Sequence, residues 1–288
     1  MTLPTFLIIG AAKAGTTSLH FYLDQHPEVQ MSRVKETNFF AGPANGIPYP
    51  VGRVDRREDY EALFDPAFPV RGEASPSYSN APRRPGVPRR IKELVPEARF
   101  VYLVRDPIDR LVSQHQMRVA DGKERLSFRE AVAQLDDADP HSFHLTCQSF
   151  YGRQLEHYLE EFPQERILVL DQARLRSERE ATLAEVFGFL GVDSGFRAGA
   201  FESELFKGSG KRRYPPWLAR AKPALRRSVA VLPAGLRDRL RASVEQSLPQ
   251  VPELEVEPAE RDRLRELFAP DVARLRELTG LRFETWSV

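Results

Sequence analysis

The chain has 288 residues, and its 41% hydrophobic and 29% charged residues are typical of a folded protein rather than a disordered one. Its 42 Lys and Arg residues nearly match its 41 Asp and Glu residues, so the net charge of +1 indicates neither a nucleic-acid nor an anionic-membrane partner. Cys147 is the only cysteine, which excludes an intrachain disulfide and a zinc site of several thiolates, and we expect it to be packed in the core.

The first strand is predicted at residues 6–9, a short apolar run closed by Gly10. This run is too short for a signal peptide or a membrane span and no basic residues precede it, so we expect a cytoplasmic protein whose fold starts near its first residue. A turn rich in glycine and alanine follows over residues 10–15. A helix is then predicted over 16–25, where a His-Pro pair ends it.

A second core strand is predicted at residues 99–104 and a third at 166–170, because both runs are short and apolar. Asp106 can cap the helix that follows the second strand, with Pro107 in its first position. The other expected elements are helices at about 91–94, 107–120, 148–162 and 181–190 and loops at 43–53 and 84–90.

Beyond residue 214 the sequence becomes rich in Arg, Ala, Leu and Pro, which predicts short helices over 216–250 and an amphipathic helical pair over 258–280. Earlier in the chain, strands alternate with helices, which favours a parallel sheet covered on both faces. We therefore predict one α/β domain over residues 1–288, with a parallel sheet flanked by helices and residues 215–288 as its helical C-terminal segment.

A phosphate-binding turn is predicted where the first strand meets the first helix, in the sequence Gly-Ala-Ala-Lys-Ala-Gly-Thr-Thr-Ser over residues 10–18. Glycines allow consecutive backbone N–H groups to face an anion, and the helix N-terminus adds unpaired N–H groups and partial positive charge. The hydroxyls and a mobile lysine add further donors. The predicted ligands of this P-loop-like turn are Lys13, Ala14, Gly15, Thr16, Thr17 and Ser18.

This turn departs from the Walker A pattern of kinases and ATPases, which has a lysine directly after its last glycine. Here Thr16 follows Gly15, and Lys13 precedes that glycine by two residues. A P-loop phosphotransferase or nucleotide kinase stays open as an alternative, because the apolar run that ends in Asp171 resembles a Walker B strand that holds Mg²⁺.

A second anion site is predicted directly after the second core strand. Arg105 follows the carboxyl end of that strand, where α/β sheets place their ligands. Ser113 lies seven residues beyond the Asp106 cap and therefore on the same face of the helix. An arginine and a serine that converge there can hold a phosphate group.

Together these motifs resemble the sulfotransferases that use 3′-phosphoadenosine 5′-phosphosulfate (PAPS), above all their carbohydrate (heparan-type) branch and its bacterial relatives. The resemblance implies that Lys13 bridges the 5′-phosphate and the transferring sulfonate, while Arg105 and Ser113 bind the 3′-phosphate. The basic, glycine-containing segment over residues 207–215 is similar to the loop that wraps the nucleotide in this family. The matching contacts there are Lys211 and Arg212.

The general base is predicted in the sequence Lys-Glu-Thr-Asn-Phe-Phe over residues 35–40. It resembles the Lys-Glu-Pro-His-Phe-Phe segment of the carbohydrate sulfotransferases, in which the glutamate acts as the base. That role falls on Glu36, with Lys35 near the sulfonate. His115 is the alternative base, because it follows Ser113 on the same predicted helix.

A last similar segment, Glu-Ala-Ser-Pro-Ser-Tyr over residues 73–78, implies substrate contacts for Ser75 and Tyr78. Ala74 stands where many relatives carry a lysine, which argues against a glycosaminoglycan-like acceptor. We expect acceptor choice to depend on residues 42–60, 120–145 and 215–250.

The resemblance implies transfer of a sulfonate group from PAPS to a hydroxyl of a carbohydrate or other small-molecule alcohol, by in-line displacement with release of 3′,5′-ADP. No His, Asp and Glu residues cluster at ligand spacing, so no metal is predicted. A non-catalytic nucleotide-binding protein is a further alternative, which would keep Lys13 and Arg105 for binding and need no base. The acceptor and the oligomeric state stay open.

Overall fold

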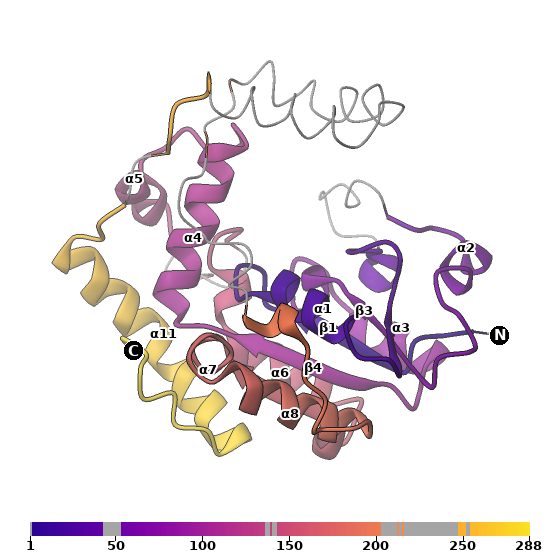
Figure 1. The fold of residues 1–288 in the computed structure, drawn as a ribbon. Helices are drawn as coiled ribbons and strands as arrows, with labels where there is room; N and C mark the ends of the chain where they lie inside the picture. The colour runs from indigo at the N-terminus through magenta and orange to yellow at the C-terminus, as the bar shows by residue number, and fades with distance from the viewer. Residues whose placement is uncertain are drawn as a thin grey trace.

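The structure is a computed structural model, and it describes residues 2–42, 53–135, 139, 143–202, 212, 215, 247–251 and 254–288. Its centre is a five-stranded sheet in the order β2-β3-β1-β4-β5, in which every neighbouring pair is parallel. The predicted parallel α/β sheet is thereby confirmed (Figure 1). The strands are β1 (Phe6–Gly10), β2 (Val29–Met31), β3 (Val70–Ala74), β4 (Arg99–Val104) and β5 (Ile167–Asp171).

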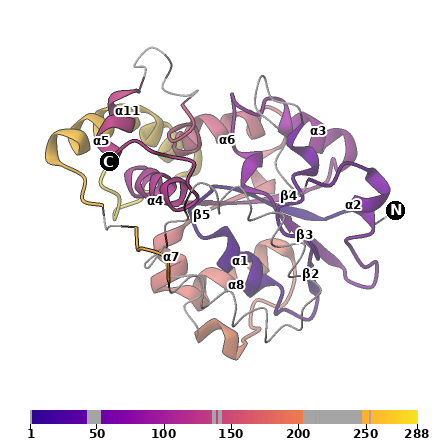
Figure 2. The ribbon, with the colours of Figure 1, turned by 90° about the horizontal axis from the view of Figure 1, so that it is seen from above.

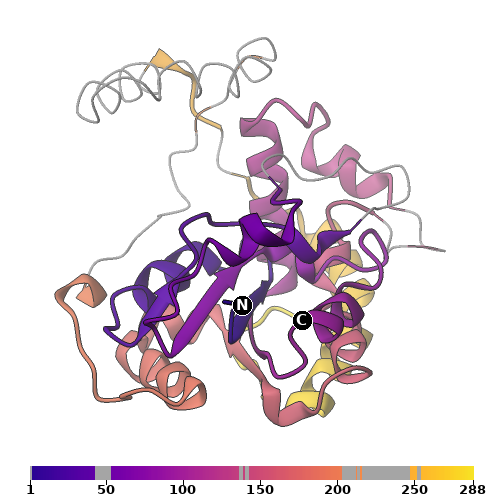
Figure 3. The same ribbon diagram turned by 90° about the vertical axis from the view of Figure 1, so that its right-hand side faces the viewer.

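Helices cover both faces of this sheet. The described helices are α1 (Thr16–Leu23), α2 (Arg57–Glu61), α3 (Val87–Leu94), α4 (Pro107–Ala120), α5 (Phe128–Ala133), α6 (Tyr151–Leu159), α7 (Gln172–Ser177), α8 (Arg179–Leu190) and α11 (Pro258–Thr279). Seen from above, α3, α6 and α11 lie on one side of the strands, and α1, α7 and α8 lie on the other (Figure 2). Figure 3 shows the same two layers from the side, with α1 and α8 opposite α11.

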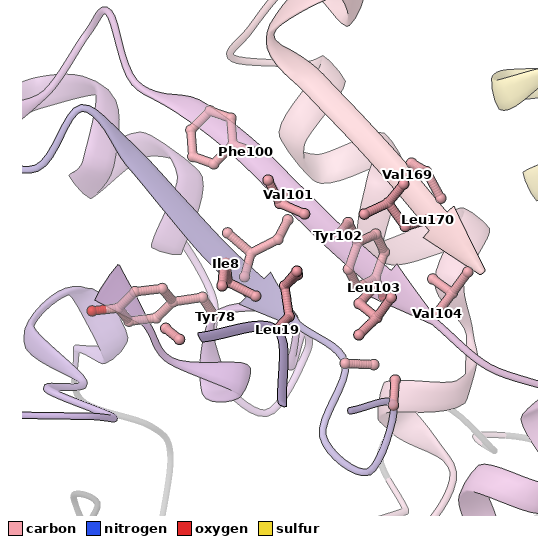
Figure 4. Packing of buried hydrophobic residues seen from close by; sticks show 14 of the residues in the cluster. Ile8, Leu19, Tyr78, Phe100, Val101, Tyr102, Leu103, Val104, Val169 and Leu170 are labelled. Carbon is pink, nitrogen blue, oxygen red and sulfur yellow. The ribbon is translucent and has the colours of Figure 1, made fainter. Parts of the chain in front are cut away.

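The two middle strands, β1 and β4, form the centre of the core. All residues of β1 are buried, and so are residues 100–104 of β4. Figure 4 shows β1, β4 and β5 side by side, with Ile8, Val101 and Leu170 among the side chains packed there. A strand buried on both faces has a continuous apolar sequence, which is why these three strands are predictable from composition alone. Their carboxyl ends all meet at one edge of the sheet, and the turns that leave this edge carry the predicted site.

The sequence does not predict β2 and β3. β2 has only three residues, and β3 reads Val-Arg-Gly-Glu-Ala, with two charged residues in five. Pairing with β1 sets the position of β3, since Phe6 lies opposite Gly72, where an added Cβ would lie 2.2 Å from the Phe6 ring. Close packing of this kind is a property of two strands together and leaves no local pattern.

Two predicted element boundaries are wrong. The helical pair expected over 258–280 is the single helix α11, which continues through Pro270 and ends at Gly280 with a φ of 71°. α3 begins at Val87, inside the segment 84–90 that was expected to be a loop, because Pro88 fits the first turn of a helix. Most of the short helices predicted over 216–250 lie outside the described residues.

Candidate functional site

The turn between β1 and α1 crosses the carboxyl edge of the sheet. It is fixed to the neighbouring strand β4 by a hydrogen bond from the Ala11 N–H to the Leu103 carbonyl, at 2.6 Å. Gly10 cannot be replaced without movement, because a Cβ there would lie 2.0 Å from the Ser79 Oγ. Gly15 caps α1 with a φ of 97°, a conformation that favours glycine. The sequence composition of this turn therefore follows from its tight path between β3, β1 and β4.

The turn presents the N-terminus of α1 at this edge. The first N–H groups of a helix have no acceptor within the helix, and the helix dipole adds partial positive charge there. Thr16 is buried at this position, and Thr17 and Ser18 are half-buried. The structure thus places the predicted phosphate-binding turn at a helix N-terminus, and its binding of an anion stays a prediction.

Lys13 brings the positive charge of this turn. Its backbone has a φ of 72°, and its side chain is half-buried. Burial lowers the pKa of the Lys13 ammonium group, and the positive charges of Arg105 and Arg110 lower it further, while Asp121 and Glu36 act in the opposite direction. The lysine therefore lies within electrostatic reach of two arginines, and an anion bound there would offset their mutual repulsion.

Arg105 joins the two predicted anion sites. Its Nη1 donates to the Lys13 carbonyl at 3.4 Å, and its Nη2 lies 3.4 Å from Asp109 Oδ2. The contact exists because β1 and β4 are direct neighbours in the sheet, so that the turn after one strand meets the turn after the other. Asp106 caps α4 as predicted, and its Oδ1 accepts from the Ile108 N–H at 2.9 Å.

The sequence does not single out Arg110, an arginine of α4. Arg110 is fully buried; its Nε donates to Ser149 Oγ at 2.5 Å and its Nη2 donates to the Leu145 carbonyl. Burial lowers the pKa of its guanidinium group. The signal was its place one turn before Ser113 on α4, which puts both residues on the same helix face. Its buried charge adds to the positive potential around Lys13.

The predicted base lies on the segment that follows β2. The Glu36 side chain is 54% exposed, and its Oε1 lies 2.8 Å from the Lys35 Nζ. Its backbone has a φ of 60°, and its N–H donates to the carbonyl of Ala74, at the carboxyl end of β3, at 3.0 Å. The negative charge of Glu36 acts to raise the pKa of Lys13, which is the smallest of the effects on that group.

His115, the alternative base, is buried in the packing of α4 against α5. Its Nε2 lies 3.0 Å from the carbonyl of Leu126, and its ring meets Phe128 edge to face at 5.4 Å between centroids. Burial lowers the pKa of this imidazole. These contacts place His115 in the packing between α4 and α5, and the choice between Glu36 and His115 as the base stays a prediction.

Ser75 and Tyr78, the predicted substrate contacts, are both buried. The Ser75 Oγ accepts from the Asn38 N–H and the Tyr78 hydroxyl accepts from the Phe40 N–H, each at 3.1 Å. The two side chains therefore stabilise the backbone of the segment that carries Glu36.

Of the predicted nucleotide-wrapping contacts, Lys211 lies outside the described residues. Arg212 forms an antiparallel bridge with Gln250, and its Nη1 donates to the Leu248 carbonyl at 3.1 Å. Its predicted contact with the nucleotide stays a prediction.

Asp171, which resembles a Walker B aspartate, already has two partners. Its Oδ1 accepts from the Ala173 N–H at 2.9 Å as the cap of α7, and its Oδ2 accepts from the Trp286 Nε1 at 3.2 Å. These hydrogen bonds assign Asp171 to the packing of the C-terminal segment.

Within the described ranges, no three His, Cys, Asp or Glu side chains form a group suited to a metal ion. None of the helices in the same ranges has the length and hydropathy needed to cross a membrane.

Comparison with known proteins gives consistent matches. The model of the "Sulfotransferase family" matches residues 53–196. The chain is 30% identical over 207 residues to the bovine (Bos taurus) bifunctional heparan sulfate N-deacetylase/N-sulfotransferase 2, covering 66% of this chain and 22% of that protein. It is also 33% identical over 120 residues to the membrane-associated sulfotransferase kil1 of Dictyostelium discoideum, covering 41% of this chain and 24% of that protein. The chain thus spans less than a quarter of the length of these relatives.

Among solved structures, a sulfotransferase from Alicyclobacillus acidocaldarius is similar over the full length of both chains, with a TM-score of 0.73 and 26% sequence identity. The resemblance therefore extends beyond the family-matched segment to the β1–α1 turn and to α11.

Proposed function

This chain belongs to the sulfotransferase family, and from that premise we propose that it transfers a sulfonate group from PAPS to the hydroxyl of an acceptor and releases 3′,5′-ADP. The observation that carries the proposal is the contact between Arg105 and the Lys13 carbonyl. It brings together two anion sites, as a nucleotide with a phosphate group at each end of its ribose requires.

Donor binding rests on charge and on directed N–H groups. The turn at residues 10–18 and the start of α1 offer backbone donors to the 5′-phosphosulfate. Arg105 and Ser113 offer a guanidinium fork and a hydroxyl to the 3′-phosphate. Lys13, Arg105 and Arg110 supply positive charge within reach of one another, which matches a donor with several negative charges.

The residues of the site divide the chemistry between them. Glu36 accepts the proton of the acceptor hydroxyl as the oxygen attacks sulfur, and its exposed carboxylate can meet an incoming acceptor. The bond between sulfur and the bridging phosphate oxygen breaks, and the electron pair stays on the departing 3′,5′-ADP. Lys13 offsets the negative charge that grows on that phosphate.

The acceptor is proposed by class only. A hydroxyl of a glycan or of another small-molecule alcohol fits a base held on the surface of the protein. Ala74 gives no positive charge beside the base, and the nearest positive charge on this segment is Lys35. This arrangement favours an acceptor with few sulfate or carboxylate groups next to the reacting hydroxyl.

Calorimetric titration with 3′,5′-ADP tests the proposal. We expect micromolar binding, about −8 kcal/mol, by the wild type, and a loss of about tenfold or more in Lys13→Ala and in Arg105→Ala. Lys92→Ala and Arg89→Ala, which remove exposed cations of α3, are the matched controls and should bind as the wild type does.

Turnover of PAPS is then measured in the presence of EDTA. Transfer to an alcohol under these conditions supports the sulfotransferase. Equal binding of ATP and 3′,5′-ADP, or a requirement for Mg²⁺, would reject the donor in favour of a phosphotransferase. Binding without any turnover would instead identify a nucleotide-binding protein.

A further inference from the structure

A buried carboxyl group lies directly behind the predicted base. Glu73 belongs to β3 and is fully buried. The groups that face its carboxyl are the hydroxyls of Thr37, Ser75, Tyr60 and Tyr78. Burying a carboxyl group costs free energy unless its oxygens are hydrogen-bonded. The proposed reaction gives this group no chemical role.

Three consecutive backbone N–H groups, in the segment next to Glu36, donate hydrogen bonds to three of these hydroxyls. The Asn38 N–H donates to Ser75 Oγ at 3.1 Å, the Phe39 N–H to Thr37 Oγ1 at 3.4 Å, and the Phe40 N–H to the Tyr78 hydroxyl at 3.1 Å. Each hydroxyl oxygen acts as an acceptor in these bonds. Its own proton must therefore point elsewhere.

The Glu73 carboxyl group accepts the hydrogen bonds that these hydroxyls donate. Its Oε2 accepts from Thr37 Oγ1 and, at 3.4 Å, from Ser75 Oγ. The Tyr78 hydroxyl lies 3.5 Å from Thr37 Oγ1, so it continues the same chain of hydrogen bonds. The Oε2 atom accepts both of these hydrogen bonds, whereas a hydroxyl can turn either way. One buried carboxyl group thus fixes the direction of the hydroxyls that hold the backbone.

The backbone of residues 36–38 has an unfavourable conformation, which other contacts must stabilise. Glu36 and Asn38 have φ values of 60° and 51°, a region that costs a residue other than glycine about 1 kcal/mol or more. The Asn38 Nδ2 donates to the Glu36 carbonyl at 2.6 Å and closes the turn. On its other side Phe39 stacks on the Tyr60 ring at 4.1 Å. The direction of the Glu36 side chain follows from this turn.

We propose that Glu73 is a positioning residue, which orients the Thr37, Ser75 and Tyr78 hydroxyls and so fixes the turn that directs Glu36 toward the acceptor hydroxyl. The proposal rests on the proposed function for the role of Glu36. The effect of Glu73 on the backbone does not depend on that function. The backbone effect and the catalytic effect are therefore measured in separate experiments.

Hydrogen–deuterium exchange measures the backbone. In Glu73→Leu, the N–H groups of residues 38–40 should exchange about tenfold faster or more than in the wild type, while peptides from β4 keep their rates. Glu73→Gln retains an oxygen that accepts from Thr37 and Ser75 and should keep the wild-type rates. Thr37→Val removes the same hydrogen bond from the other side, and it also removes the acceptor of the Phe39 N–H. If Glu73→Leu does not fold, faster exchange of the Asn38 and Phe40 N–H groups in Thr37→Val therefore carries the test.

Steady-state kinetics measures the consequence for catalysis. A displaced Glu36 should lower kcat about 100-fold in Glu73→Leu and Thr37→Val, with the affinity for 3′,5′-ADP within about twofold of wild type. Wild-type exchange over residues 38–40 in Glu73→Leu would overturn the inference, as would faster exchange with full kcat. A wild-type protein without sulfonate transfer would remove the proposed function and the catalytic half of the inference, whereas exchange would still decide the backbone half.

Discussion

Replacing Glu73 by glutamine should change how stability depends on pH. Burial raises the pKa of this carboxyl from 4.5 to about 7, although the surrounding hydroxyls act to lower it. An unfolded chain exposes the group, which then titrates near its ordinary value. Between these two pH values the folded protein holds a proton that the unfolded chain has released, so the free energy of unfolding falls as pH rises through this window.

The difference between the two pKa values corresponds to about 3 kcal/mol of lost stability above about pH 8. Glu73→Gln has no charge to bury. It should therefore match the wild type at about pH 4.5 and exceed it by about 3 kcal/mol at about pH 8, less any cost of the altered hydrogen bonds. Burial also raises the pKa of Asp171 and of Asp271, but both groups titrate in both proteins and cancel in the comparison.

Equilibrium urea unfolding at several pH values measures this difference, with the slope of each transition checked for constancy. Glu36→Gln is the matched control, because it removes an exposed carboxylate and leaves Glu73 in place. A gain in Glu73→Gln that does not vary with pH would refute the linkage argument. A loss of stability at about pH 8 would show that the charge contributes more through hydrogen bonds than it costs through burial.

Glu36→Gln should lower kcat about 100-fold or more while 3′,5′-ADP affinity stays near that of the wild type, because the base acts on the acceptor proton. Wild-type turnover in this variant would exclude Glu36 as the base. Gly10→Ala should lower the free energy of unfolding by about 2 kcal/mol or more in urea, since a Cβ would lie 2.0 Å from the Ser79 Oγ. An unchanged urea midpoint would mean that the Ser79 side chain moves aside at little cost.

Local sequence was sufficient for the strands and turns that carry the donor site. β1, β4 and β5 are largely continuous apolar runs. Asp106 begins α4 by accepting hydrogen bonds with its side chain, and Gly15 begins α1 with a left-handed backbone conformation that favours glycine. The Lys13 turn and Arg105 were identified separately, as two pieces of chain ninety-two residues apart. These features depend on neighbours in sequence, which a pattern can represent.

The supporting side of the site could not be predicted in the same way. Ser75 and Tyr78 were expected to contact substrate, and the structure gives them hydrogen bonds to the backbone of residues 38–40. Arg110 and Glu73 were not predicted as buried residues, because a charged residue in a sequence is expected at the surface. Only the structure shows that both side chains are buried and that they form hydrogen bonds inside the protein.

The sequence by itself determined that two turns, both predicted to bind anions, follow two buried strands, because backbone conformation and strand burial depend on local composition. The order β3-β1-β4 decided that these turns touch, since strand order depends on contacts between residues far apart in the chain. The pairing of β2 with β3 brought Glu73 next to the segment of Glu36. There the buried carboxyl group meets hydroxyls from its own segment, from the segment after β2 and from α2. Such a network has no periodicity in sequence, because its members share a place in space and not a spacing along the chain.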